Sequence, residues 1–181
     1  MNQVARTIAI FVGLTFAAGA LAFGAGAPPE HCPEITVART EQAAVAAVGW
    51  IIDNQQPDGT WLYEYDRAND VEIEGYNIVR HAGVMSALYQ AGGRGYDGAF
   101  ESADRGLAWA LDHLVERNGW AGVTTTTSVQ AGTNSLMLAA LVERRLYTDD
   151  TSYDDLMAKL GMFLVSQVEP SGALLAYYDL G

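Results

Sequence analysis

Apolar residues recur with helical spacing in several stretches of the chain, and glycine-rich turns separate these stretches. Residues 43–52 are rich in alanine and valine, which predicts a helix that begins near Thr40 and closes at Asp53-Asn54. The same reasoning predicts further helices at 76–90, 106–117, 129–145 and 156–165. Residues 61–66 alternate and carry aromatic side chains, which favours a short extended segment. The pattern therefore predicts an all-α protein.

The chain repeats one pattern of helix, glycine turn and helix. Its clearest copies are Gly49-Trp50 followed by Asp58-Gly59-Thr60-Trp61, and Gly161-Met162 followed by Ser171-Gly172-Ala173-Leu174. A weaker copy around Asn118-Gly119-Trp120 lies between them, so the unit is about 55 residues long. A unit that cannot bury its own apolar stripe must stack on its neighbours, so the repeat predicts an array of helical hairpins. The last copy stops at Gly181 in mid-repeat, and we expect the sequence to be truncated.

The connections between the predicted helices are polar. The acidic stretches 101–104 and 149–155 are expected to be loops, and a longer polar loop follows residue 66. Long loops at one edge of an array are where functional residues usually gather.

The first 27 residues do not belong to the array. Arg6 precedes an uninterrupted apolar run from Thr7 to Phe23, and Ala25-Gly26-Ala27 follows, which is typical of an export signal. A retained membrane anchor is the alternative. We therefore expect a signal peptide or anchor over 1–27, a linker over 28–39 and a domain over 40–181. The protein is expected to be exported, periplasmic or secreted, and to touch a membrane only through the first segment.

Composition narrows the possible partners and cofactors. The 10 Lys and Arg against 22 Asp and Glu give a net charge of −12, which argues against nucleic acid or an anionic membrane as the partner. The lone cysteine excludes an internal disulfide framework. No cysteine or histidine pair has the spacing of zinc ligands, and we predict neither a metal nor a cofactor.

The hexapeptide Gln56-Pro57-Asp58-Gly59-Thr60-Trp61 resembles the glutamine-tryptophan motif of the triterpene cyclases. The rhythm of outer helix, loop and inner helix over residues 40–181 is similar to the wider α/α-toroid group, which includes six-hairpin glycosidases, uronate epimerases and polysaccharide lyases. This resemblance implies helical-hairpin repeats that form part of an α/α toroid. It also implies structural roles for Gln56, which would cap an outer helix, and for Trp61, which would stack on the next turn.

Four polar residues share one face at the start of the predicted helix 76–90. Tyr76 and Arg80 are spaced i,i+4, as are Asn77 and His81, so the four side chains are expected to face a common cavity. The arrangement is similar to sugar-acting toroid enzymes, whose inner helices present such groups to a saccharide. We expect Tyr76, Asn77 and Arg80 to bind substrate, with Arg80 gripping a carboxylate or sugar edge, and His81 to transfer protons.

The segment before this helix offers carboxylates and aromatic rings. Glu64 and Asp66 are the predicted acid and base partners of catalysis. Trp61, Tyr63 and Tyr65 are predicted to form an aromatic floor for a sugar ring. A structural interpretation of the same residues is also open, in which Arg80 pairs with Glu72 or Glu74, His81 is a core histidine bonded to the neighbouring hairpin, and the aromatic rings belong to the core.

The sequence thus predicts an exported carbohydrate-active protein that acts on a polysaccharide or glycoconjugate by glycosidase, lyase or epimerase chemistry. A first alternative is a non-catalytic repeat module that binds glycan or protein. A second alternative is a terpenoid-cyclase-like enzyme, which is disfavoured because Asp149-Asp150 and Asp154-Asp155 lack the spacing of an aspartate motif and are better explained as helix caps.

Overall fold

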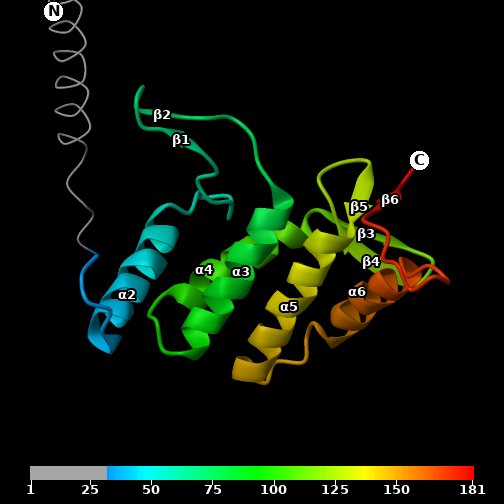
Figure 1. Cartoon of the computed structure of the whole chain (residues 1–181). Coiled ribbons are helices and arrows are strands. Elements are labelled where there is room, and N and C mark those ends of the chain that lie inside the picture. Colours follow the sequence, from blue (N-terminus) through cyan, green and yellow to red (C-terminus); the bar gives the residue numbers. More distant parts are fainter. Residues whose placement is uncertain (1–31) are drawn as a thin grey trace, which may run out of the picture. The chain divides into compact units, whose positions relative to one another are not determined.

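The computed structural model describes residues 32–181 (Figure 1), so the predicted signal or anchor segment lies outside the described residues. The chain divides into one unit up to Arg39 and a second from Thr40 to Gly181. Helix α2 (Val37–Asp53) ends where predicted but begins one turn before Thr40. The hydroxyl of Thr36 accepts a hydrogen bond from the N–H of Arg39 at 3.3 Å, which makes Thr36 the capping residue at this end.

The second unit is a set of helical hairpins, as predicted. Its other helices are α3 (Ile78–Gly93), α4 (Ala99–Leu111), α5 (Ala131–Thr148) and α6 (Asp154–Ser166). Three small antiparallel strand pairs connect them: β1 (Tyr65–Asp66) with β2 (Val71–Glu72), β3 (Leu114–Arg117) with β4 (Trp120–Val123), and β5 (Ser128–Gln130) with β6 (Tyr177–Asp179). No helix among residues 32–181 combines the length and apolarity needed to cross a membrane.

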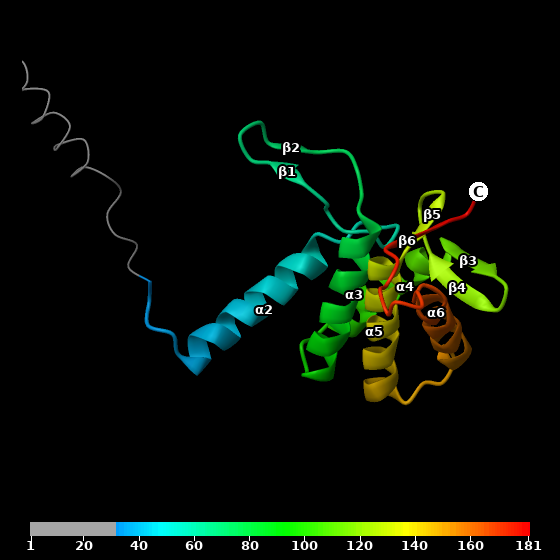
Figure 2. The same ribbon diagram turned by 45° about the vertical axis from the view of Figure 1, so that its right-hand side comes forward.

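The core lies between the helices of successive hairpins. Helix α3 packs against α4 and α5, and α5 packs against α6 (Figure 2). Helix α3 contributes buried Met85 and Leu88, and α5 contributes buried Met137 and Leu141. A smaller cluster joins Trp120 of β4 and Val129 of β5 to Phe163 of α6. Each hairpin therefore buries its apolar stripe against the next, as expected of a repeat array.

The two clearest sequence repeats adopt the same backbone structure. At the first turn the N–H of Gln56 donates to Thr60 O at 2.7 Å, and at the second the N–H of Glu169 donates to Ala173 O at 2.9 Å. The φ angles of the two turn glycines, Gly59 and Gly172, are +95° and +85°, a region that favours glycine. The repeat inferred from the sequence is therefore confirmed at the level of individual hydrogen bonds.

The middle copy is a β-hairpin, which corrects the predicted helix over 106–117. Asn118 and Gly119 have φ of +50° and +83°, as in the tight turns that join adjacent strands, and Arg117 pairs with Trp120 across the turn. Helix α4 instead begins at Ala99 and includes the acidic stretch 101–104 that was predicted to be a loop. Ser102 and Ala103 in this stretch are fully buried, and the acidic side chains beside them are exposed.

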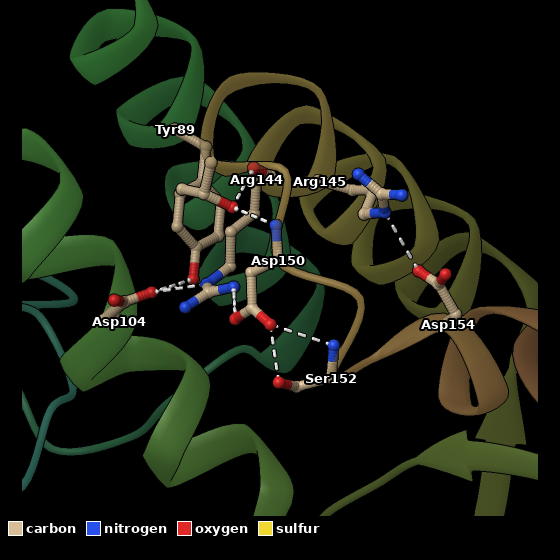
Figure 3. A network of polar contacts seen from close by, with 8 residues as sticks. Tyr89, Asp104, Arg144, Arg145, Asp150, Ser152 and Asp154 are labelled. Atoms are coloured by element: carbon tan, nitrogen blue, oxygen red, sulfur yellow. Dashed lines mark hydrogen bonds and ion pairs between the residues drawn. The ribbon is translucent and has the colours of Figure 1, made fainter.

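A polar network joins three helices at the end of α3 remote from the β1–β2 hairpin (Figure 3). The Tyr89 hydroxyl and the Arg144 Nε–H both donate to Asp104 Oδ1, at 2.7 and 2.9 Å. Arg144 also pairs with Asp150 at 2.5 Å, and Asp150 accepts from the N–H and hydroxyl of Ser152. These contacts connect α3, α4 and α5 to the loop before α6.

Candidate functional site

Two adjoining pockets lie where the Gly59 turn and the β1–β2 hairpin meet the N-terminal end of α3. The smaller, which we call the Arg80 pocket, has a volume of about 110 Å³ and is lined by Trp61, Leu62, Tyr63, Tyr76, Asn77, Arg80, His81 and Val84. The larger, which we call the Glu74 pocket, has a volume of about 220 Å³ and is lined by Gln56, Thr60, Trp61, Leu62, Tyr63, Glu72, Ile73, Glu74, Gly75 and Tyr76. Six of the nine site residues predicted from the sequence therefore line one pocket.

The first turn of α3 places the polar residues of this pocket. Asn77 is the N-cap of α3, and its Oδ1 accepts from the N–H groups of Val79 and Arg80 at 2.9 and 3.1 Å. This side chain therefore satisfies two of the donors that a helix leaves free at its start. Its predicted role in substrate binding stays a prediction.

His81 is held by two hydrogen bonds within the protein. Its Nε2 is 2.9 Å from the carbonyl oxygen of Gly106, which only accepts, so Nε2 carries the proton. Its Nδ1 therefore accepts from the hydroxyl of Tyr76 at 2.6 Å. The ring is 2% exposed, and burial lowers the pKa of His81 to about 4. His81 is thus a neutral core histidine bonded to the neighbouring hairpin, which confirms the structural interpretation of this residue; its predicted proton transfer stays a prediction.

Aromatic rings pack around His81. The Trp61 ring lies 4.9 Å from the His81 ring on one side and the Trp109 ring lies 4.4 Å away on the other, centroid to centroid. Trp61 reaches this position because Gly106 has no side chain: a Cβ there would lie 2.3 Å from Trp61 Cη2. The indole N–H of Trp61 is buried and has no hydrogen-bond partner among the described residues. The indole of Trp61 is therefore held by packing without a hydrogen bond of its own.

Tyr76 connects this packed centre to the pocket wall. Its hydroxyl accepts from the backbone N–H of Trp61 at 3.2 Å while it donates to His81. Burial raises the pKa of Tyr76 to about 12, so the hydroxyl keeps its proton at neutral pH. Its ring lies 6.2 Å from that of Tyr63, centroid to centroid, and both tyrosines line both pockets.

Arg80 is the only positively charged residue that lines either pocket. Its guanidinium carbon lies 4.8 Å above the centre of the Tyr63 ring. Within residues 32–181 it makes no ion pair, so the alternative in which Arg80 pairs with Glu72 or Glu74 is wrong. The side chain is exposed, and the planar fork of donors is available to an incoming ligand.

Three of the predicted residues lie on the β1–β2 hairpin and line neither pocket. Asp66 closes the hairpin loop by accepting from the N–H of Ala68 at 2.8 Å and from the Asn69 amide at 2.6 Å, and these bonds lower the pKa of Asp66. The Tyr65 hydroxyl donates to Asp70, and Glu64 is exposed. Glu72, which pairs with Tyr65 across the hairpin, lines the Glu74 pocket, but Glu64, Tyr65 and Asp66 do not join the other six residues in a pocket lining.

The structure adds two residues that the sequence did not single out. Trp109 of α4 packs on His81 and Tyr76, and its position in the repeat, four residues into the Gly106 segment, was the available signal. Gln55, next to the predicted Gln56, contacts the side of α4 and does not cap it: its Nε2 donates to Ser102 O at 2.9 Å, and its Oε1 accepts from Arg105 at 2.9 Å. Gln55 thereby joins the end of α2 to the next outer helix.

Within the described part of the chain, no group of three or more His, Cys, Asp and Glu side chains is placed to hold a metal ion. The pockets are instead built from aromatic rings, one guanidinium and two carboxylates.

Comparison with solved structures shows the type of fold. The chain is similar to a D-mannose isomerase, with a TM-score of 0.64 and 18% identity over 80% of this chain and 40% of the isomerase. It is also similar to an alpha-amylase from Clostridium perfringens, with a TM-score of 0.54 and 14% identity over 76% of this chain and 42% of the amylase. No protein-family model and no curated protein sequence matches the chain.

These likenesses confirm the predicted fold class. The chain consists of helical-hairpin repeats that form part of an α/α toroid. It spans about two fifths of the length of each of the two solved proteins.

Proposed function

We propose that this protein acts on carbohydrate and that the Arg80 and Glu74 pockets bind the saccharide. The observation that carries the proposal is the combination of aromatic walls with an unpaired guanidinium at the loop end of α3. Both solved proteins that share the fold are named as enzymes that act on carbohydrate, a D-mannose isomerase and an alpha-amylase. This supports a carbohydrate substrate for the present protein by analogy of fold.

The chemistry of the walls suits a sugar ring. Tyr63 and Tyr76 offer aromatic surface against which the C–H face of a pyranose loses contact with water. Glu72 and Glu74 offer acceptors for hydroxyl groups, and Arg80 offers donors. Both pockets are smaller than the roughly 300–1,000 Å³ typical of drug-sized ligands. We therefore expect the site to hold one sugar unit at a time.

For the reaction itself we propose glycosidase, lyase or epimerase chemistry, with Glu64, Asp66 and His81 as the proton-transfer groups. The ligand would have to draw the β1–β2 hairpin toward the pockets, because Glu64 and Asp66 line neither of them. Closure of a loop over bound substrate is a common way to complete a catalytic set.

A second candidate is a protein that binds glycan without turnover. The observation that favours it is that both nitrogens of His81 are bonded within the protein. The carboxylates of Glu72 and Glu74, which line the Glu74 pocket, are exposed, and neither residue was predicted to be catalytic.

One screen separates the two candidates. The protein is incubated with a panel of oligosaccharides, and both binding and product formation are recorded for the wild type and for Tyr63→Ala. Tyr147→Ala is the matched control, because Tyr147 lies in the last turn of α5 and lines neither pocket. Binding that is lost only in Tyr63→Ala supports the proposal, and product formation decides for the enzyme. Absence of binding to every saccharide contradicts both candidates.

We also propose that the protein is exported through residues 1–27. Amino-terminal sequencing of the protein recovered outside the cytoplasm tests this: a terminus near the Ala25-Gly26-Ala27 segment supports cleavage, and exclusive recovery from the cytoplasm contradicts export.

A further inference from the structure

We propose that the two pockets select an acidic saccharide: the carboxylate of a uronic acid lies in the Arg80 pocket, and the ring hydroxyls face the Glu74 pocket. This inference rests on the proposed function, because it names the substrate class of the same site. Its support is the distribution of charge around the pockets.

The two pockets have opposite charge. The Arg80 pocket is lined by one arginine and by no aspartate or glutamate. The Glu74 pocket, which shares Trp61, Leu62, Tyr63 and Tyr76 with it, is lined by Glu72 and Glu74 and by no basic residue. A cationic pocket is unusual on a chain in which 22 acidic residues face 10 basic ones. A ligand that fills both pockets must therefore present an anionic group to one and hydrogen-bond donors to the other.

Arg80 is prepared for a carboxylate. Its guanidinium lies over the ring of Tyr63 and makes no ion pair within residues 32–181, whereas Arg144 and Arg145 are each held by two aspartates. A guanidinium whose orientation is already fixed loses less side-chain entropy when it binds a carboxylate through two parallel hydrogen bonds.

A uronic acid fits this arrangement better than an acidic peptide. A uronic acid unit carries one carboxylate and several hydroxyl groups on a single ring, which matches one cation beside two hydrogen-bond acceptors. An acidic peptide brings a carboxylate on every residue and would place some of them against Glu72 and Glu74, where like charges repel.

The test compares each acidic oligosaccharide with its own neutral form. Oligosaccharides derived from hyaluronan, alginate and pectin are titrated against the full chain, each beside a counterpart whose carboxylates have been reduced to alcohols. The variants are Arg80→Gln, Arg80→Lys and the control Arg94→Gln. Arg94 is an exposed arginine that donates to Gln90 O and lines neither pocket.

We expect at least one acidic oligosaccharide to bind about tenfold or more tightly than its reduced form, as one charge-assisted bidentate contact provides. Arg80→Gln abolishes this preference, Arg80→Lys retains part of it, and Arg94→Gln leaves it unchanged. The preference also declines as salt is added.

Equal binding of the acidic and reduced forms, or a preference that survives in Arg80→Gln, overturns this inference and leaves the proposed function standing. Equally tight binding of polyglutamate overturns it as well, because the site would then recognise charge without a sugar. If no saccharide of either kind binds, both this inference and the proposed function fail.

Discussion

The two ends of helix α3 use arginine in opposite ways. At one end Arg144 reaches from α5 and is held between Asp104 and Asp150, while the buried hydroxyl of Tyr89 donates to the same Asp104 oxygen (Figure 3). At the other end Arg80 lies on the ring of Tyr63, beside a pocket and without a carboxylate among the described residues. The first arginine is held by the fold, and the second is the residue to which we assign ligand binding.

The contrast teaches how function can be recognised in a repeat array. Aromatic rings pack at both ends, and what differs is the use of charge: the Arg144 end adds ion pairs to the packed rings of Tyr89 and Phe100 and to the contact of Arg144 with Tyr153. The Arg80 end has packed rings and one chain of hydrogen bonds, and Arg80 makes no ion pair within residues 32–181. A charge that the fold already satisfies contributes to stability, whereas an unsatisfied charge beside an aromatic pocket contributes little to stability and is available for recognition.

The largest effect is expected at the centre of the aromatic end. Trp61→Ala removes a ring that is 7% exposed and packs on His81 and Gly106, so we expect the free energy of unfolding to fall by about 3–5 kcal/mol. Trp50→Ala is the matched control, because Trp50 is 59% exposed, and the change there should be below about 1 kcal/mol. Urea unfolding of both variants measures this. Equal losses in the two variants would contradict the packing account.

A comparable effect should appear when the pH is lowered. The pKa of His81 is lowered to about 4 in the folded protein, against about 6.5 in the unfolded chain, so below pH 6.5 the unfolded state binds a proton that the folded state does not. The free energy of unfolding therefore falls as the pH is lowered from 6.5 toward 4, and the total decrease due to His81 is about 3 kcal/mol. Denaturation at several pH values measures the slope.

Two variants check that His81 causes this pH dependence: His81→Gln is the test, and His113→Gln is the comparison. We expect the first to flatten the slope between pH 6.5 and 4, whatever its effect on stability at neutral pH. His113 is a lesser cause of the lowered pKa of His81 than burial is, so its replacement should change the slope much less than His81→Gln does. A slope unchanged in His81→Gln would show that another group is responsible.

At the opposite end, Arg144→Met should cost about 2 kcal/mol, because the side chain is 14% exposed and its removal leaves Asp104 and Asp150 without their cation. The neighbouring Arg145 offers the control: its side chain is 34% exposed, and it pairs with the exposed carboxylates of Asp149 and Asp154. Arg145→Met should cost less than about 1 kcal/mol. Thermal unfolding of the two variants measures these losses of stability. Equal losses would contradict the view that the Arg144 network stabilises the fold more than the exposed pairs of Arg145 do.

The smallest change in stability is expected for Arg80→Gln. Because this arginine has only a cation–π contact with Tyr63, its replacement should alter the free energy of unfolding by less than about 1 kcal/mol. The same variant should lose saccharide affinity, whereas Arg144→Met should retain it under conditions where it is folded. A large loss of stability in Arg80→Gln would mean that its charge serves the fold after all.

The sequence was most informative where residues are close along the chain. The glycine turns at Gly59 and Gly172 follow from repeated turn residues, and the four polar residues near the start of α3 do line one pocket. The helix begins only at Ile78, however, so Tyr76 and the N-cap Asn77 reach the pocket from the segment before it. The β3–β4 hairpin was missed although Asn118-Gly119 is a strong hairpin signal, because the helical pattern before it was extended too far.

The remaining differences depend on contacts between distant residues. Gln55 and Gln56 are adjacent and chemically identical, and only the position of α4 decides which of them reaches Ser102. Likewise Glu64 and Asp66 line neither pocket, whereas Glu72 of the paired strand β2 lines the Glu74 pocket, and only the folded hairpin decides which of these carboxylates faces it. Trp109 joins the site from another hairpin, and that juxtaposition arises only when the hairpins stack.

The most direct test of the account follows the indole N–H signals of the four tryptophans by NMR while saccharide is added. Variants in which each tryptophan is replaced by phenylalanine assign the signals. The account predicts that the Trp61 signal moves with saturable dependence on ligand, because Trp61 lines both pockets, and that the Trp120 signal stays in place, because Trp120 packs in the separate cluster with Phe163. A Trp61 signal that does not respond to a saccharide that binds, together with movement of Trp120 or Trp50, would place the binding site elsewhere and contradict the account.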